Sequence, residues 1–478
     1  MPRAVQFGAK VRRLRQRRKL SQVELARLLS ISPSYMNLIE HDQRPLTAPL
    51  LLELARVLAV DLGEFTGGAT GAVHGDLVEA LSDPLFEEQG VTARDVDELC
   101  TQSPALARAM LRLYQAFREA RGSADTLASQ IYDDQQIPSE RSRMPSEEVS
   151  DFLQRRGNYF EALEDAAQRL RADAGIDPHD PQRGLVRHLT ERLGVEVRIG
   201  RQGHKEGVLR RYEAEARRLH LSELMPQSSR GFQLAVQIAL MQERALLDRL
   251  AAEAELVDAA SSALGRVVLA NYFAAAVMMP YATFLECARA ERYDIELLQH
   301  RFGASFEQVC HRLTTLRRPG AEGVPLHMIR VDLAGNISKR FSASGIRFAR
   351  FSGACPRWNV FTAFMSPGVI RVQVSVMPDG VPFFCLSRTV PKGRGGYTAP
   401  HTLHAIGLGC PLEHAPQLVY SDGVDLETRD GAVPVGVTCR LCERRDCEQR
   451  AFPSIRAGMA VDEDVRGPSV YAPRGLES

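Results

Sequence analysis

The sequence lacks any run of about 18 apolar residues, the length that crosses a bilayer as a helix. Its N-terminus also lacks the pattern of a secretory signal peptide. Both absences predict a cytoplasmic protein without a membrane segment. Net charge is nearly absent as well, at +1 over 478 residues. That balance hides a basic N-terminal end, which is typical of a phosphate-seeking module attached to an otherwise neutral protein.

Disulfide bonds are not expected either, although the chain contains nine cysteines. Thiols stay reduced in the cytoplasm, so clustered cysteines are better interpreted as metal ligands. The chain is also too long for a single hydrophobic core, and its 478 residues predict about three domains.

Residues 21–40 predict two short helices joined by a tight turn. Ser21 can cap the first helix, with Glu24 at the capping-box position. Ser32 can cap the second, and Pro33 follows at the first helical position, where its missing N–H costs nothing. Apolar residues at helical spacing form a seam along which the two helices can cross closely: Leu25, Ala26, Leu29, Ile31, Met36 and Ile39.

Polar side chains gather around the start of the second helix, where a helix-turn-helix keeps those that meet base edges. An ordinary helical hairpin is the alternative. The segment before Leu20 is strongly basic and free of acids, and a second amphipathic segment follows at residues 47–60, so DNA binding is favoured. The residues expected to meet the groove are Gln22, Ser32, Ser34, Tyr35 and Asn37, and those expected to hold phosphates are Arg15 and Arg44, with other basic residues of the first helix.

Residues 5–66 resemble the Cro/C1-type (XRE) DNA-binding domain. The pair Ile39-Glu40 and the run Arg44-Pro45-Leu46-Thr47 match its pattern. Ser30 departs from it, because the turn of that family usually has Gly, so a slightly different turn geometry is expected. The resemblance implies a helix-turn-helix domain over residues 1–66.

Residues 67–147 predict a helical connector. Its helix at residues 105–120 has an apolar face, which suits a dimer contact, a docking arm or plain core. The residues of that face are Leu106, Met110, Leu113, Tyr114 and Phe117. A polar segment with Pro138 and Pro145 then predicts a hinge into the next domain.

Residues 148–318 are predicted to be mostly helical and resemble the ImmA/IrrE-type zincin domain. That family carries His-Glu-x-x-His on a helix, where two His bind zinc and the Glu is the general base. Here the corresponding positions are Val236, Gln237 and Leu240, and no histidine lies between His220 and His300. Residues 266–270 offer no carboxylate as a third ligand. We therefore expect no zinc there and no enzyme, which disfavours the alternative of an ImmA-like protease acting on a repressor.

Residues 319–478 predict a mixed α/β domain built on an antiparallel sheet, which can carry a pocket for a small ligand on its covered face. Gly335-Asn336 separates two predicted strands as a hairpin turn. A second hairpin is predicted from residues 369–377 and 381–389, with Pro378-Asp379-Gly380 as the turn.

Residues 439–447 contain a cluster of three cysteines whose spacing predicts a metal site. Cys439 and Cys442 have the Cys-x2-Cys spacing that brings two thiolates to one centre, and Cys447 can supply a third. Cys410 is the preferred fourth ligand. Spacing alone leaves an iron–sulfur cluster and structural zinc both open. Other candidates for the fourth ligand are Cys355, Cys385, His401, His404 and His414.

Taken together, the three regions resemble the short-chain fatty acyl transcriptional regulators, which include propionate-utilisation and glyoxylate-cycle regulators. The motifs that carry this resemblance are Gly409-Cys410-Pro411 and Cys439-Arg440-Leu441-Cys442-Glu443-Arg444, joined to the helix-turn-helix and the degenerate zincin. It implies a regulator of propionyl-CoA or acetyl-CoA metabolism whose C-terminal domain senses an acyl-CoA. It also implies an iron–sulfur cluster, of the 4Fe-4S type, on the matching cysteines. A regulator that senses only the redox state of such a cluster is the rival interpretation.

The prediction as a whole is a multidomain α+β protein that binds a double-stranded DNA operator as a homodimer or higher homo-oligomer. It comprises an N-terminal all-α helix-turn-helix bundle, a helical connector, a helical zincin-like middle domain, and a C-terminal mixed α/β sensor domain with an antiparallel sheet. Their predicted bounds are 1–66, 67–147, 148–318 and 319–478.

Overall fold

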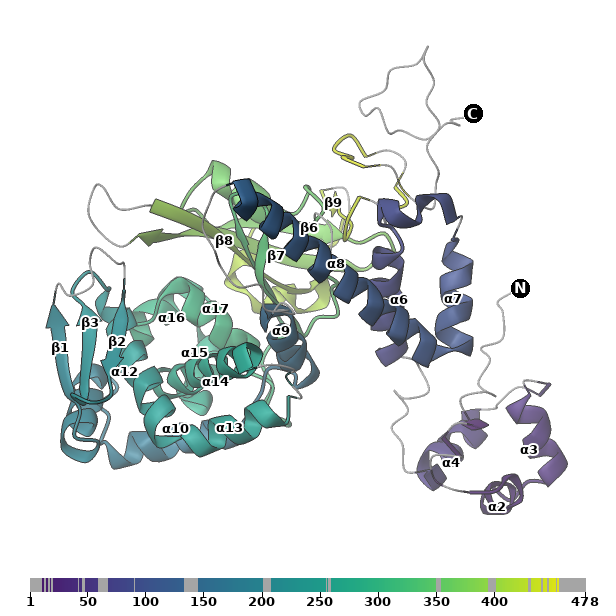
Figure 1. Ribbon diagram of the computed structural model, residues 1–478, viewed down its shortest axis with the longest axis horizontal. Helices are drawn as coiled ribbons and strands as arrows, with labels where there is room; N and C mark the ends of the chain where they lie inside the picture. The colour runs from purple at the N-terminus through teal and green to yellow at the C-terminus, as the bar shows by residue number, and fades with distance from the viewer. Residues whose placement is uncertain are drawn as a thin grey trace, which may run out of the picture. The chain divides into compact units, whose positions relative to one another are not determined.

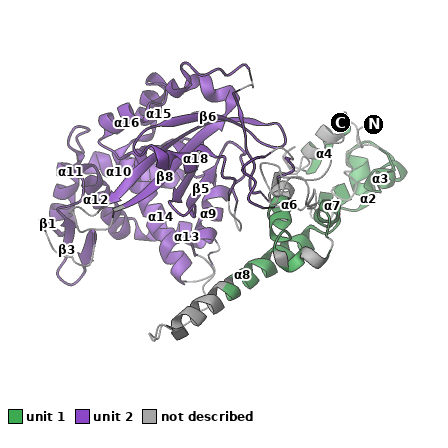
Figure 2. Cartoon of the chain, turned by 90° about the horizontal axis from the view of Figure 1, so that it is seen from above, with its two compact units in different colours: residues 1–139 green, residues 140–478 purple. Residues whose placement is uncertain are grey.

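The computed structural model divides the chain into two compact units, residues 1–139 and 140–478 (Figure 2). It describes residues 11–12, 14–15, 18, 20–41, 43–44, 48–58, 68–89, 91–132, 145–200, 208–254, 256, 259–349, 354–393, 401–428, 431–439, 442–444, 447–452 and 454. Mixed helix and sheet make up these residues, which confirms the predicted α+β class.

The first unit begins with the predicted helix-turn-helix. It contains α2 (Gln22–Leu28), α3 (Pro33–Glu40) and α4 (Ala48–Leu58). Both predicted caps are confirmed: Ser21 and Glu24 form a reciprocal capping box, and the Ser32 hydroxyl accepts a hydrogen bond from the N–H of Tyr35 at 3.1 Å. The predicted apolar seam packs into one core, with Ile31 at its edge. Ser30 adopts φ +53°, the left-handed region that favours glycine, so its turn keeps the geometry for which Gly is usual.

Four further elements are described in the first unit: α6 (Gly68–Ala80), η1 (Pro84–Gln89), α7 (Ala93–Gln102) and the 29-residue α8 (Pro104–Tyr132). Helix α8 packs against α6 and α7 through Ala107, Leu111 and Tyr114, which are buried. The Tyr114 hydroxyl donates a hydrogen bond to Asp83 at 2.8 Å. The inner face of α8 is therefore covered within its own unit.

The second unit begins with a helical body and a small sheet of strand order β1-β3-β2 (Figure 1). Among the described helices, α14 has the length and composition of a membrane span, and 61% of that window is buried inside the unit, as in a core helix. The elements are α9 (Pro145–Arg155), α10 (Glu161–Asp173), α11 (Pro181–Arg187), η2 (His188–Arg192), β1 (Glu196–Gly200), β2 (Arg210–Glu213), β3 (Arg218–Ser222), α12 (Gln227–Gln242), α13 (Arg244–Ala252), α14 (Ala259–Met278), α15 (Tyr281–Ala290), α16 (Ile295–Phe302) and α17 (Phe306–Thr314).

A six-stranded sheet of order β5-β4-β8-β7-β6-β9 forms the rest of the second unit. Neighbouring strands are antiparallel except β6 and β9, which are parallel. Both predicted hairpins are confirmed, β4 with β5 and β6 with β7. The elements are β4 (His327–Asp332), β5 (Ile337–Ser342), α18 (Asn359–Thr362), η3 (Ala363–Met365), β6 (Arg371–Val376), β7 (Pro382–Gly393), β8 (His401–Pro411), η4 (Leu412–Gln417), η5 (Val419–Ser421) and β9 (Val433–Pro434).

The two faces of this sheet belong to different cores. On β8, Ile406, Leu408 and Cys410 join the core that the sheet shares with the helical body. Ala405 points the other way, into a second core with Trp358. This alternation follows from the two-residue period of a strand, and it decides which side chains can meet at each site.

Candidate functional site

The predicted base-reading residues lie on and beside the first turns of α3. Ser34 and Asn37 are exposed, and Tyr35 is half-buried. Gln22, at the start of α2, donates to the side-chain oxygen of Asn37 at 3.3 Å. The structure therefore brings Gln22 and Asn37 together on the surface of the motif, while Ser32 is used as the helix cap.

The two predicted phosphate-binding arginines lie in different environments. Arg44 is exposed just beyond α3. Arg15 instead forms a two-pronged ion pair with the buried Glu40, at 2.6 and 3.0 Å, and donates to the carbonyl of Leu20 at 2.9 Å. The guanidinium of Arg15 thus ties the segment before α2 to α3, a use that the sequence did not reveal.

The zincin-like positions lie within the core of the second unit. Val236 and Gln237 are buried on α12, and Leu240 packs against the same core. Val and Leu side chains have no atom that can bind zinc. Val236 and Leu240 pack α12 into this core.

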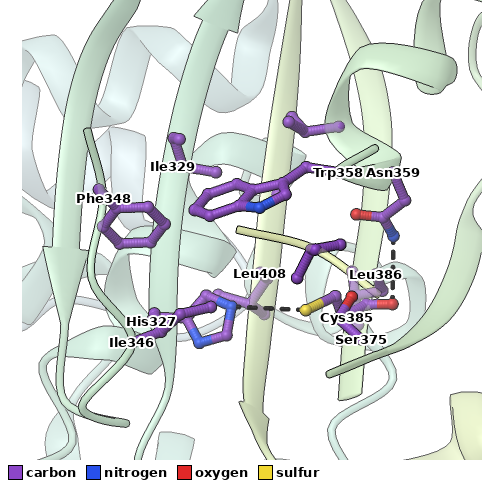
Figure 3. A pocket seen from close by; sticks show the side chains of 13 residues that line it. His327, Ile329, Ile346, Phe348, Trp358, Asn359, Ser375, Cys385, Leu386 and Leu408 are labelled. Atoms are coloured by element: carbon purple, nitrogen blue, oxygen red, sulfur yellow. Dashed lines mark hydrogen bonds between the residues drawn. The ribbon is translucent and has the colours of Figure 1, made fainter. Parts of the chain in front are cut away.

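A small cavity lies on the side of the six-stranded sheet that faces away from the helical body (Figure 3). Its space of about 20 Å³ has room for one water molecule. No charged side chain lines it. Its thirteen lining residues are His327, Ile329, Ile346, Phe348, Trp358, Asn359, Val360, Ser375, Cys385, Leu386, Gly407, Leu408 and Val435.

His327 and Cys385 face each other in this cavity, with 3.7 Å between imidazole Nε2 and thiol Sγ (Figure 3). Burial lowers the pKa of His327 to about 3 and raises the pKa of Cys385 to about 12. Both groups are therefore neutral at pH 7, and the thiol is not an activated nucleophile. The pair supplies polar contacts in an apolar cavity.

Two glycines of β8 make room for this arrangement. A Cβ on Gly409 would lie 2.6 Å from the His327 ring, and one on Gly407 would lie 2.8 Å from Ile329. Both contacts are shorter than van der Waals distance, so only glycine lets β4 side chains lie flat on β8. The motif Gly407-Leu408-Gly409 therefore has a packing role beside the cavity.

The cysteine loop (residues 435–450) begins beside the same cavity. The Trp358 indole lines the cavity and donates to the carbonyl of Gly436 at 2.9 Å. A Cβ on Gly436 would lie 3.2 Å from the Sγ of Cys442, so that thiol packs directly on this glycine. The N–H of Cys355 donates to the carbonyl of Val437 at 3.1 Å. Cys355 and the loop are thus joined through backbone contacts.

Cys355, Cys439 and Cys442 gather on this side of the sheet. Burial raises the pKa of the Cys355 thiol, and Cys439 and Cys442 lie close enough to raise it further. Cys447 is half-buried in the same loop. Cys410, the preferred fourth ligand from the sequence, lies fully buried on the opposite face of β8, where burial also raises its pKa. Of the alternatives left open above, the structure brings Cys355 to the loop.

The buried side chain of Arg450 holds the backbone of the cysteine loop through hydrogen bonds. Its buried guanidinium donates to the carbonyls of Cys439 and Cys442, each at 2.9 Å, and to that of Arg444. Among the described residues, no three His, Cys, Asp or Glu side chains are grouped closely enough to hold a metal ion. Residues 440–441 and 445–446, within the loop, lie outside the described part of the chain. Thiolates are the ligands that zinc and iron–sulfur clusters take from cysteine, so the chemistry of these side chains fits such a group, although the described thiols are not arranged around one centre.

Comparisons with known proteins agree along the whole chain. A helix-turn-helix domain family matches residues 6–65, the IrrE N-terminal-like domain matches residues 190–314, and the short-chain fatty acyl coenzyme A regulator C-terminal domain matches residues 315–471. The HTH-type transcriptional regulator RamB of Mycobacterium tuberculosis is 38% identical over 471 residues, 98% of this chain and 99% of that protein. The chain belongs to this family of transcriptional regulators.

Other members are similar over the same length. The HTH-type transcriptional regulator PrpR of M. tuberculosis is 37% identical over 97% of this chain and 95% of its own. A propionyl-CoA carboxylase regulator of Cereibacter sphaeroides is 39% identical over 98% and 99%. A solved M. tuberculosis transcriptional regulator is 41% identical, covers 68% of this chain and 98% of its own, and superposes with a TM-score of 0.65.

Sequence reasoning about this regulator did not find the residues that build its cavity. His327 begins β4 and Trp358 immediately precedes α18, and only the packing of α18 against the sheet brings both to one cavity. The one available signal was composition, since Trp358 is the single tryptophan of the chain.

Proposed function

We propose that this regulator binds operator DNA in the cytoplasm through α3 and that an acyl-CoA, with or without an iron–sulfur cluster, controls this binding. The observation that carries the DNA part is the capped helix-turn-helix with exposed Ser34 and Asn37. The names of its relatives support genes of propionyl-CoA or related acyl-CoA metabolism as targets. We infer that the IrrE-like region does not cleave peptides, because Val236, Gln237 and Leu240 stand at the zinc positions.

A single helix-turn-helix reads only a few base pairs, so we infer a homodimer on two half-sites. Support comes from the outer face of α8, where Leu106 and Leu113 are 54% and 71% exposed. With Met110 and Phe117 these leucines keep the alternating three- and four-residue spacing of a coiled-coil seam. Helix α8 would thereby join two copies of the first unit.

The cavity is the site we assign to the acyl group. Its lining is apolar, and its polar groups His327 and Cys385 are neutral, which suits a short uncharged chain. A space for one water must widen to admit even a small acyl group. Trp358 lies in the wall that the cavity shares with the cysteine loop, so widening would act on Gly436 through their hydrogen bond.

For the cluster, we propose Cys355, Cys439, Cys442 and Cys447 as the four thiolates. When bound, an iron–sulfur cluster supplies a group that exchanges an electron and reacts with oxygen. Arg450 holds the loop backbone for these thiolates through the Cys439 and Cys442 carbonyls. The redox-only interpretation differs in that acyl-CoA would then have no effect on DNA binding.

Operator binding is tested with Asn37→Ala and Arg44→Ala in the full chain. Asn37→Ala should relax sequence preference, because it removes a base contact. Arg44→Ala should weaken binding to all DNA about equally and lower the salt dependence by roughly one ion. Wild-type behaviour of both variants on a cognate operator would contradict the assignment of α3.

Acyl-CoA binding is tested by the fluorescence of the single tryptophan. Titration of the full chain with propionyl-CoA should change Trp358 emission, because this indole lines the cavity. A Trp358→Phe variant provides the blank. Saturable binding measured by calorimetry without any change in emission would place the acyl group elsewhere.

Metal content separates the two interpretations of the cysteines. Protein purified without oxygen should be brown, with iron and sulfide in equal amounts. Cys355→Ser and Cys442→Ser should remove the colour, and Cys410→Ser is the matched control on the other face of β8. A colourless, zinc-loaded wild type would rule out the cluster, and loss of colour only in Cys410→Ser would restore the ligand set first predicted from the sequence.

A further inference from the structure

A cluster of basic side chains surrounds one carboxylate where the six-stranded sheet meets α17. Glu307, in the first turn of α17, accepts hydrogen bonds from Arg330 at 2.7 Å and from Lys339 at 3.0 Å, and it forms an ion pair with Lys392 at 3.3 Å. These cations come from β4, β5 and β7. Three positive charges against one negative charge leave this cationic cluster with an excess of two.

The neighbouring histidines do not add to that excess. Burial, together with Lys339 and Arg330, lowers the pKa of His311 to about 4, and its neutral ring lies 3.0 Å from the Lys339 ammonium. Burial and the charges of Lys392 and Arg330 also lower the pKa of His404. Both rings are therefore uncharged at pH 7.

A second carboxylate, that of Asp332, acts on His404 but is held by the backbone of its own turn. Asp332, at the end of β4, accepts from the N–H groups of Ala334 and Asn336 and from the Asn336 amide, at 2.9 to 3.0 Å. It thus holds the β4–β5 hairpin. Glu307 remains the one carboxylate that pairs with Lys339 and Lys392 among the residues that the structure describes.

Donors of the cluster remain available to a ligand. Within the described residues, the Lys392 ammonium has Glu307 as its single partner, although it carries three N–H groups. Lys339 and Lys392 are 42% and 43% exposed, so solvent and ligands reach both. His404 adds a buried Nδ1 that has no hydrogen-bond partner in the described part of the chain.

We propose that Lys339, Lys392 and His404 form a binding site for a phosphate group. Paired lysines with excess positive charge suit a phosphate, which takes Lys as a point charge. A phosphate would share the two ammonium groups with Glu307 and would accept from the His404 ring. Arg330, more deeply buried, holds Glu307 in place.

This inference rests on the proposed function and deepens it. Coenzyme A carries phosphates, and the cavity assigned to the acyl group has no charged lining residue. The phosphates must therefore bind elsewhere. The cluster lies on the helix-facing side of the sheet, opposite the cavity, because Arg330 alternates with the cavity residue Ile329 along β4. One coenzyme A that occupied both sites would therefore have to pass the end of the sheet at which Asp332 of β4 pairs with His404 of β8.

The test uses inorganic pyrophosphate, coenzyme A and pantetheine, which lacks phosphate, on the full chain at fixed ionic strength. Pyrophosphate and coenzyme A should raise the melting temperature of the wild type, and pantetheine should not. Lys339→Gln and Lys392→Gln should each weaken binding of both phosphate compounds about tenfold, because each removes a charge-assisted hydrogen bond. Arg371→Gln, an exposed arginine on β6, is the matched control and should change nothing.

The outcomes show whether the phosphate that binds this site belongs to coenzyme A or to another compound. Binding of pyrophosphate and coenzyme A, both lost in the lysine variants, assigns the site to the effector. Binding of pyrophosphate alone keeps the phosphate site but separates it from coenzyme A. Lysine variants that melt lower yet bind pyrophosphate as the wild type does would reduce the cluster to a structural network and overturn the proposal. A wild type that responds to pyrophosphate but to no acyl-CoA would instead contradict the proposed function.

Discussion

Arg15 and Glu40 illustrate how a single side chain takes its role from burial. The Glu40 carboxylate is 1% exposed and Arg15 is 12% exposed, so their ion pair is largely removed from water. Removing one partner of such a pair leaves the other charge buried and uncompensated. Arg44, with no such partner among the described residues, keeps its guanidinium exposed to solvent and DNA.

Arg15→Gln should therefore lower the free energy of unfolding of the helix-turn-helix by about 2 kcal/mol, somewhat less than for a fully buried pair. The salt dependence of residual DNA binding should stay as in the wild type, because no phosphate contact is lost. Thermal melting and operator titrations at several salt concentrations measure the two effects. A lower salt slope with unchanged melting would make Arg15 a phosphate contact after all.

His327 predicts a pH dependence of stability. Its pKa of about 3 in the folded chain lies below the ordinary histidine value of about 6.5. Between these values the unfolded chain binds one more proton, so stability falls as pH decreases, by up to about 1.4 kcal/mol per pH unit from this residue. Above pH 6.5 this contribution is complete.

Urea unfolding of the second unit between pH 7 and 4 checks this dependence. His327→Gln should flatten the slope by about one proton, and His179→Gln, an exposed histidine, should leave it unchanged. If His327→Gln fails to fold, the wild-type slope itself is informative. A wild type whose stability does not change from pH 6.5 to 4 would contradict a neutral buried His327.

At the scale of an element, the backbone of the cysteine loop is held in place by one buried side chain, that of Arg450. The loop's described residues contain no helix or strand, and the two-residue strand β9 (Val433–Pro434), just before the loop, pairs with the sheet. Arg450 substitutes for regular structure by donating to several carbonyls at once. Its planar group with five donors allows this, and a lysine ammonium cannot span the same acceptors.

Arg450→Lys should therefore loosen the loop while keeping its charge. We expect faster loss of bound metal to a chelator and a lower melting temperature of the second unit, with DNA binding by the first unit retained in part. Arg371→Lys is the control. Equal rates of metal loss in both variants would show that the loop is held by other contacts.

The whole molecule carries an apolar seam on α8 that no described element covers. Leu106 and Leu113 are exposed on it, whereas Ala107 and Leu111 cover the inner face. Single exposed leucines are common on protein surfaces, but a regular seam along a long helix is typical of an interface. This seam is where the proposed dimer would form.

Leu113→Glu should shift the oligomeric state from dimer to monomer, because it places a charge within the seam. Operator affinity should fall at the same time, since two half-sites are no longer bound together. Sedimentation and operator titration measure the two effects. Leu85→Glu, an exposed leucine on η1 outside the seam, is the control, and a dimeric Leu113→Glu would move the interface elsewhere.

The sequence alone determined the helix-turn-helix, its caps, both hairpins of the large sheet and the loss of the zinc motif, because each of these features depends on residues close together in the chain. The Ser32 cap, for example, depends on residues three apart, and the loss of zinc ligands depends on what stands at Val236 and Leu240. Tertiary structure decided which distant residues meet. Strand register placed Cys410 on the face of β8 away from the cysteine loop, and only packing brought Cys355 to that loop, Arg15 to Glu40, and Lys339 and Lys392 to one carboxylate. Such contacts depend on register and burial across 25 residues or more, which no local pattern in the sequence encodes.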